Sequence, residues 1–172
     1  TYKKGIDILI KIASNIQEKN ILFVIVGSGP DLLKYKKYIV DNNLEKKIIF
    51  TGFIENNLLP LYYQAADIFI LPSRSGEALT TVIPEAFLSN LPVISTKSGG
   101  QIEIVKDGET GYLVDGDNLN LFIEKINVLV KNKDLRKYLG NNGRKIVLNN
   151  LSWNSHMTSL ISIYEDLMKI KG

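Results

Sequence analysis

The sequence contains no cysteine and a single histidine, His156, among its 172 residues. Disulfides and thiolate metal sites are therefore excluded, as are zinc sites built on histidine clusters and the usual Ser-His and Cys-His catalytic pairs. No apolar run approaches the roughly 20 residues that a transmembrane helix needs. The absence of cysteine fits a reducing compartment, so we expect a cytoplasmic protein.

Excess charge of one sign is also missing. The 21 Lys and Arg residues nearly balance the 18 Asp and Glu residues, and the net charge of +3 does not by itself indicate a nucleic-acid partner. Hydrophobic residues make up 45% and charged residues 23%, which is typical of one globular domain of this length. No period of 20–50 residues repeats, which argues against solenoids and propellers.

Five short apolar runs, each followed by a longer amphipathic stretch, organise the chain. Each run is rich in Ile, Val, Leu or Phe and is bounded by Gly, Pro, Ser or Asp, which is typical of strands buried on both faces. Their alternation with helices predicts an α/β fold with an open, doubly wound, Rossmann-like parallel sheet. The runs are Ile21–Gly27, Ile48–Phe53, Asp67–Pro72, Leu91–Thr96 and Gly111–Asp115.

Apolar residues at helical spacing fill the intervals between these runs and the tail of the chain. The chain opens on the turn TYKKG and passes straight into a helix, whereas a doubly wound domain normally opens with a strand. We therefore expect a first strand upstream of Thr1. The predicted helices are Ile6–Glu18, Pro30–Asn42, Asn57–Ala65, Thr81–Ser89, Leu119–Val130, Lys133–Leu148 and Ser152–Ile170.

The turn after the first run is one candidate binding segment, because ligands of open α/β sheets bind outside the carboxyl ends of the strands. The glycines of Gly27-Ser28-Gly29-Pro30 would let a phosphate or sugar approach backbone N–H groups. The third glycine of the dinucleotide fingerprint and the Gly-Lys-Ser/Thr of the P-loop are missing, so neither NAD-type nor P-loop binding is supported. The alternative is a tight turn with Pro30 at the first helical position.

A pair of carboxylates eight positions apart marks the second candidate segment. Glu77 lies in a polar loop, and Glu85 lies in the following helix among apolar neighbours, where an unpaired carboxylate is costly. Such a pair can bind hydroxyls of a sugar or ribose, and the free N–H groups of residues 78–82 can hold a pyrophosphate. The alternative is that Glu77 only complements the helix dipole and Glu85 is a solvated helix residue.

Motifs along nearly the whole chain carry a family resemblance. Glu77-x7-Glu85, within PSRSGEALTTVIPEAFLSNLPVISTKSGG, resembles the E-x7-E motif of the retaining GT-B glycosyltransferases of family 4. The resemblance implies that residues 1–172 form the nucleotide-sugar donor-binding domain, with residues 152–172 as its C-terminal helix, and that an N-terminal acceptor domain is absent. The other matching blocks, in the family's order, are KGIDILI, FVIVGSGP, IIFTGFI, LYYQAADIFILPS, PVISTKSGGQIEIVKDGETGYLV, the Leu-Arg, Leu-Gly and Gly-Arg pairs within Leu135–Arg144, and Ser152–Trp153.

The resemblance also implies roles for individual residues. Lys4 resembles the lysine that contacts the donor diphosphate, Glu77 the glutamate that binds hydroxyls of the donor sugar, and Glu85 the glutamate that binds the ribose. Lys4 and Glu77 are the candidate catalytic residues. Ile54 would meet the base through its backbone, and the amides of residues 79–82 would meet the phosphates. The full set of candidate donor-binding residues is Lys4, Gly27, Ile54, Glu77, Ala78, Leu79, Thr80, Thr81, Val82 and Glu85.

Two departures from the family stand out. The arginine that usually lies a few residues before the lysine is absent, because Thr1 comes too late for it. The loop after the first glutamate reads Ala78-Leu79-Thr80, where the family often has Gly-Phe-Gly or Gly-Phe-Pro, so the donor sugar is undetermined.

The reaction that the resemblance implies moves a sugar from a UDP- or GDP-linked donor to an acceptor hydroxyl with retention, without a cofactor or a metal. It implies cell-surface polysaccharide or glycolipid synthesis, a glycan or lipid-linked acceptor bound through the missing domain, and an inactive isolated chain. Lysines at positions 34, 36, 37, 46 and 47 leave a peripheral contact with the inner face of the membrane open. The rival hypotheses are a sugar-nucleotide epimerase or phosphorylase on the same fold, and a non-catalytic nucleotide- or partner-binding α/β module.

Overall fold

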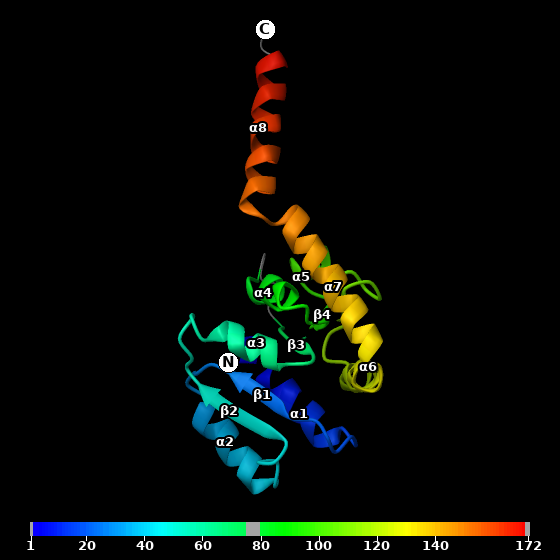
Figure 1. Cartoon of the computed structure of the whole chain (residues 1–172). Helices are drawn as coiled ribbons and strands as arrows, with labels where there is room; N and C mark the ends of the chain where they lie inside the picture. The colour runs from blue at the N-terminus through cyan, green and yellow to red at the C-terminus, as the bar shows by residue number, and fades with distance from the viewer. Residues whose placement is uncertain (1, 75–79, 171–172) are drawn as a thin grey trace.

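Strands and helices alternate along the chain in the computed structural model, which describes residues 2–74 and 80–170 (Figure 1). All five predicted strands are confirmed, each inside its apolar run. The strands are β1 (Phe23–Val26), β2 (Ile48–Gly52), β3 (Phe69–Leu71), β4 (Val93–Thr96) and β5 (Gly111–Val114).

All seven predicted helices are confirmed, with ends that differ by a few residues. An eighth, α5, spans one turn and was not predicted, because four residues are too few for an apolar periodicity to emerge. A 3₁₀ turn (Tyr2–Lys4) precedes them. The helices are α1 (Ile6–Asn15), α2 (Leu32–Asp41), α3 (Leu59–Ala65), α4 (Val82–Leu88), α5 (Gln101–Ile104), α6 (Leu119–Lys131), α7 (Lys133–Asn150) and α8 (Trp153–Ile170).

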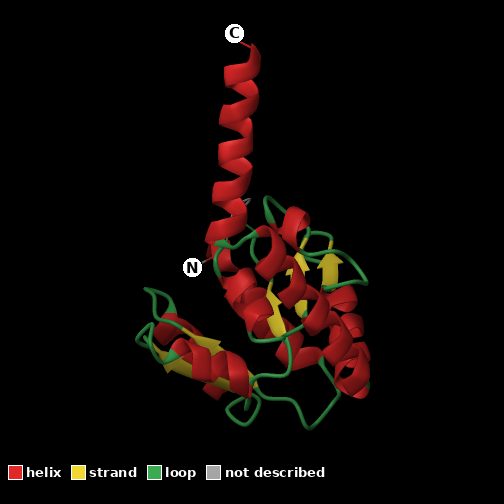
Figure 2. Ribbon diagram, turned by 45° about the horizontal axis from the view of Figure 1, so that its top comes forward, coloured by secondary structure: helices red, strands yellow, loops and turns green. Residues whose placement is uncertain are grey.

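The strands are all parallel but form two sheets instead of the single sheet that we expected (Figure 2). One sheet has the order β1-β2 and the other has the order β3-β4-β5. Within the described ranges, β1 and β3 do not pair with each other, so each keeps one edge of its backbone unpaired. The first strand expected upstream of Thr1 stays a prediction.

Two apolar clusters hold these sheets and helices together. The larger one joins α1, α2 and α6 to strands of both sheets, and it includes Ile12, Ile94 and Phe122, which are fully buried. The smaller one joins α4 to β4 and α7 around Phe87. A Cβ on Gly143 of α7 would lie 2.2 Å from the Phe87 ring, so only glycine permits this close approach of the two helices. This contact fixes α4, the helix that carries Glu85.

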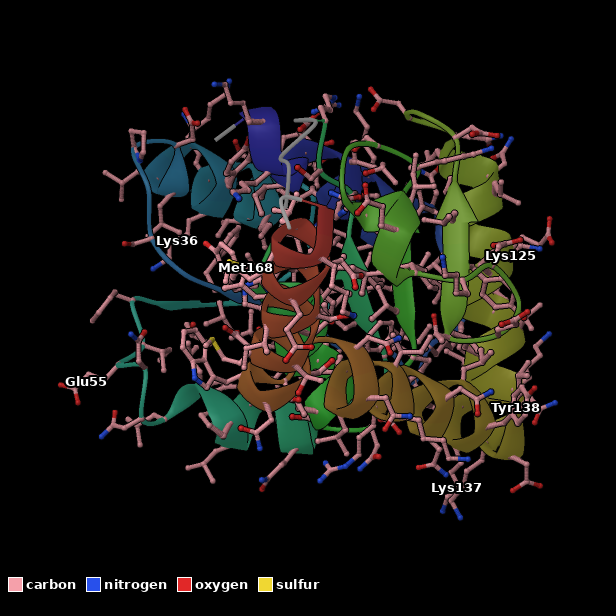
Figure 3. All side chains as sticks on the ribbon, turned by 90° about the horizontal axis from the view of Figure 1, so that it is seen from above. Lys36, Glu55, Lys125, Lys137, Tyr138 and Met168 are labelled. Carbon is pink, nitrogen blue, oxygen red and sulfur yellow. The ribbon has the colours of Figure 1, made fainter. Side chains whose placement is uncertain are left out.

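The last helix, α8, extends away from the rest of the molecule (Figure 1). Figure 3 looks along this helix from its C-terminal end, near which Met168 lies. Apolar side chains along it are exposed, with Trp153 and Met168 each 75% accessible. None of the helices in the described part of the chain is both long enough and apolar enough to cross a bilayer.

Candidate functional site

The turn that carries Lys4 is fixed against the carboxyl end of β3. The carbonyl of Lys3 accepts hydrogen bonds from the Arg74 amide at 2.9 Å and from the Ser73 hydroxyl at 3.1 Å. Gly5 has a φ of +69°, and a Cβ there would lie 1.7 Å from the carbonyl oxygen of Pro72. Only glycine therefore allows the turn to lie this close to the strand end, with the Lys4 side chain exposed.

Arg74 joins three segments at this strand end. Its guanidinium donates to both carboxylate oxygens of Asp7, at 2.7 and 2.8 Å, and to Asp117 at 3.0 Å. Asp7 begins α1, and Asp117 precedes α6. The hydrogen bonds from Arg74 hold the pKa of the Asp7 carboxyl below its ordinary value, against the opposing effect of burial. The Arg74 side chain is only 16% exposed and satisfied by two anions, so it is a structural clamp and not a free anion-binding group.

Side chains at the end of β4 also hold the segment that leaves β3. The Thr96 hydroxyl donates to the carbonyl of Ser73, and the Ser95 hydroxyl donates to the side-chain oxygen of Gln101. Ser95, Thr96 and Gln101 are all buried. The segment that leaves β3 is therefore held as far as Arg74 by hydrogen bonds with β4 and with the Lys4 turn.

Beyond the loop, the chain returns at Thr80 and enters α4. Thr80 is buried, Thr81 is the exposed N-cap, and no side chain caps the first turn. Glu85 is partly buried on this helix, and one of its carboxylate oxygens accepts a hydrogen bond of 2.9 Å from the Tyr63 hydroxyl of α3. Burial, and then the bond to Glu85, raises the pKa of the Tyr63 phenol, so it stays a donor at neutral pH.

Gly27 and Ile54 lie at the carboxyl end of the other sheet. The Gly27 amide donates to the carbonyl of Gly52 at 2.9 Å, which joins the turn after β1 to the end of β2. A Cβ on Gly27 would meet no atom within 4 Å, so there is open space beside this turn. Ile54 follows, partly buried, and its neighbour Phe53 is 74% exposed.

The described candidate residues thus divide into two groups. Lys4, the start of α4 and Glu85 belong with the three-stranded sheet, whereas Gly27 and Ile54 belong with the two-stranded sheet. The predicted positions Glu77, Ala78 and Leu79 lie outside the described residues. Within residues 2–74 and 80–170, no three acidic or histidine side chains gather as metal ligands.

The sequence did not reveal Tyr63 and Arg74. The bond from Tyr63 links residues 22 positions apart on two helices, and the bonds from Arg74 to Asp7 span 67 positions. A charged residue three positions after the end of β3 is the one local signal that could have pointed to Arg74. Ser73, in the loop after β3, is a buried donor.

Comparison with known proteins identifies the family. Residues 1–146 match the family described as "Glycosyl transferases group 1". The chain belongs to this family. Among curated group 1 relatives, a GDP-mannose-dependent alpha-(1-6)-phosphatidylinositol monomannoside mannosyltransferase of Mycolicibacterium smegmatis is 29% identical over 169 residues, which cover 94% of this chain and 44% of the relative. The chain spans less than half the length of the curated relatives that it matches first.

Solved glycosyltransferases share the architecture. A point mutant of S. aureus TarM, crystallised with fondaparinux, alpha-GlcNAc-glycerol and UDP, superposes with a TM-score of 0.85 at 26% identity, covering 94% of this chain and 33% of TarM. The isolated C-terminal domain of a group 1 glycosyltransferase, LpcC of Francisella tularensis, gives 0.78 at 30% identity, covering 89% of this chain and 82% of that domain. These likenesses confirm the parallel α/β fold class.

Proposed function

We propose that this group 1 glycosyltransferase chain binds a nucleoside-diphosphate sugar and supplies the donor half of an enzyme that transfers the sugar to an acceptor hydroxyl with retention. The single observation that carries the proposal is the position of the Lys4 turn against the carboxyl end of β3. There the Lys4 turn is hydrogen-bonded to the strand end from which the chain runs on to Glu77. A lysine carried by a turn that is fixed at the carboxyl end of a parallel sheet suits the diphosphate of such a donor.

In this proposal different residues bind different parts of the donor. Lys4 and the amides of residues 80–82 meet the diphosphate, Glu85 accepts hydrogen bonds from the ribose hydroxyls, and the backbone at Ile54 meets the base beside the open space at Gly27. Glu77, with the amides of Ala78 and Leu79, completes the site at the donor sugar. Positioning the donor and neutralising the departing diphosphate are the main contributions of these residues to the rate.

The relatives support a nucleotide donor and a polymer or lipid acceptor. The TarM crystals contain UDP and alpha-GlcNAc-glycerol, and the mycobacterial relative is named for GDP-mannose and a phosphatidylinositol acceptor. We therefore propose a UDP- or GDP-linked donor and a role in polysaccharide or glycolipid synthesis, with the acceptor bound by a further, N-terminal domain.

Contact with a membrane surface belongs to the same proposal. Lys34, Lys36 and Lys37 are exposed on α2, and Lys36 points outward in Figure 3. Lys47 does not belong to this face, because its ammonium donates to the carbonyl of Ile16 at 3.0 Å. Each lysine near an anionic lipid surface adds about 1 kcal/mol of attraction, so we propose that α2 supplies any such contact.

Calorimetry on two glutamate variants tests the proposal. Glu85→Ala should weaken binding of UDP or GDP about tenfold or more, because a hydrogen bond to a charged group contributes roughly 1.5–3 kcal/mol. Glu77→Ala should leave the bare diphosphate nearly unaffected and weaken only the intact sugar nucleotide. Glu45→Ala, an exposed glutamate beyond α2, is the control. Equal losses of diphosphate affinity in Glu77→Ala and Glu85→Ala would contradict the division of roles.

A further inference from the structure

The hydrogen bond between Tyr63 and Glu85 joins the two helices that flank β3. Tyr63 lies on α3, and its ring packs at a tilt against Phe69 of β3, with ring centroids 5.8 Å apart. Its hydroxyl reaches Glu85 Oε2 of α4 at 2.9 Å, and both side chains are partly buried. The phenol is therefore held by a strand on one side and points its single donor at one carboxylate oxygen.

Within residues 2–74 and 80–170, one carboxylate oxygen of Glu85 accepts a hydrogen bond and the other accepts none. In the described part of the chain, the Tyr63 hydroxyl is the one hydrogen-bond donor to the Glu85 side chain, and it contacts Oε2. A donor on one oxygen fixes the rotation of the carboxylate plane, which is otherwise soft. The second oxygen, Oε1, keeps its lone pairs for a ligand with adjacent hydroxyl donors.

We propose that Tyr63 is a positioning residue that fixes the Glu85 carboxylate for a vicinal diol, and that the pair thereby selects ribonucleotides over 2′-deoxyribonucleotides. The inference rests on the proposed function, because it requires that Glu85 face the ribose of the donor. The inference adds to the proposed site a residue on α3, Tyr63, and a preference for ribonucleotides. Tyr63 itself does not touch the ligand; it acts through Glu85.

The raised pKa of the Tyr63 phenol supports the same geometry, because the hydroxyl remains protonated throughout the neutral range. An ionised phenol would repel the carboxylate and release it. The Tyr63 donor to Glu85 is therefore present throughout this pH range.

Paired titrations with ribose and deoxyribose ligands test the inference. Calorimetry should compare UDP with 2′-deoxy-UDP, and GDP with 2′-deoxy-GDP, on wild type, Tyr63→Phe and Tyr62→Phe. Tyr62 is the matched control, since it adjoins Tyr63 on α3 and its hydroxyl forms no hydrogen bond within the described residues. Wild type and Tyr62→Phe should prefer the ribonucleotide at least fivefold. Tyr63→Phe should lose three- to tenfold in affinity for the ribonucleotide and little for the deoxyribonucleotide.

A second measurement separates orientation from general support of the fold. In a Glu85→Gln background, Tyr63→Phe should change the ribonucleotide affinity by less than twofold, because the carboxylate that it orients is gone. Equal losses for both nucleotides in the Tyr63→Phe variant would mean that the tyrosine is only structural, and would overturn the inference. An unchanged ribose preference in that variant would overturn it too.

Failure of the proposed function gives a different pattern. A wild-type chain that binds neither diphosphate, or that binds the ribo and 2′-deoxy forms equally, would remove Glu85 from the ribose. That result would overturn the proposed role of Glu85 and the inference with it. A wild-type preference that survives in Tyr63→Phe leaves the role of Glu85 intact and overturns the inference alone.

Discussion

Single residues far apart in sequence fix the corner beside Lys4. Arg74 is bound by Asp7 and Asp117 at the side chain, and its amide is bonded to Lys3. Paired carboxylates keep this partly buried guanidinium from being an uncompensated charge, which would be strongly destabilising. The contacts with these three partners align the start of α1, the approach to α6 and the end of β3. Arg74 therefore contributes both to stability and to the geometry of the site.

The Asp7 carboxylate makes this dependence measurable in acid. Asp7→Asn should lower the free energy of unfolding by roughly 1–2 kcal/mol at neutral pH, because a bidentate, charge-assisted pair becomes a neutral contact. The folded-state pKa of Asp7 lies below its ordinary value of 3.8. Its contribution is therefore present above pH 3.8 and is lost as pH falls through the folded-state pKa.

Urea unfolding at pH 7 and pH 3 checks this expectation. The wild-type chain should lose more stability between the two pH values than Asp7→Asn does, and the gap between them should shrink at pH 3. Glu165→Gln on α8, where the glutamate is exposed, serves as the control. A gap of the same size at both pH values would contradict the role assigned to Asp7.

At the scale of elements, the close packing of α7 on α4 depends on Gly143, which has no side chain. Gly143→Ala would put a methyl group 2.2 Å from the Phe87 ring, and such overpacking costs typically 1–3 kcal/mol. The gain in helix propensity, about 1 kcal/mol, offsets only part of this cost. Asn141→Ala, on the exposed face of α7, should instead be neutral or slightly stabilising. Thermal unfolding of the two variants should therefore shift the midpoint in opposite directions, or leave Asn141→Ala unmoved.

The elements themselves were predictable because their signals are local. The run ILFVIV predicts β1, and the spacing of Leu160, Ile161, Tyr164 and Leu167 predicts α8. The division into two sheets was not predictable, since it depends on which strand edges meet in space. Glu85 became a candidate through its spacing from Glu77 and Lys4 through the resemblance to a family, and both assignments stay predictions. Tyr63 and Arg74 act through contacts that no local pattern encodes.

At the scale of the whole molecule, the chain spans less than half the length of its curated relatives. We predict that the 172-residue chain alone transfers no sugar, because the acceptor must be held in register with the donor for reaction. Assays with candidate UDP- and GDP-sugars and acceptors should give no product above background. Calorimetry with UDP and GDP on the same preparation should still detect binding, which distinguishes a half-enzyme from an unfolded one. Measurable turnover would contradict the two-domain account.

The open edge of β1 affects how this chain associates with itself in solution. The strand and its approach, Ile21–Val26, form a six-residue apolar stretch without charge or proline, and Leu22, Val24 and Val26 are exposed. An apolar strand of this composition with one unpaired edge is a template for intermolecular β-pairing. We therefore expect self-association through this edge to compete with ligand binding as the protein concentration rises. Titrations of this chain call for light-scattering controls and a concentration series, so that heat released by association is not attributed to the nucleotide.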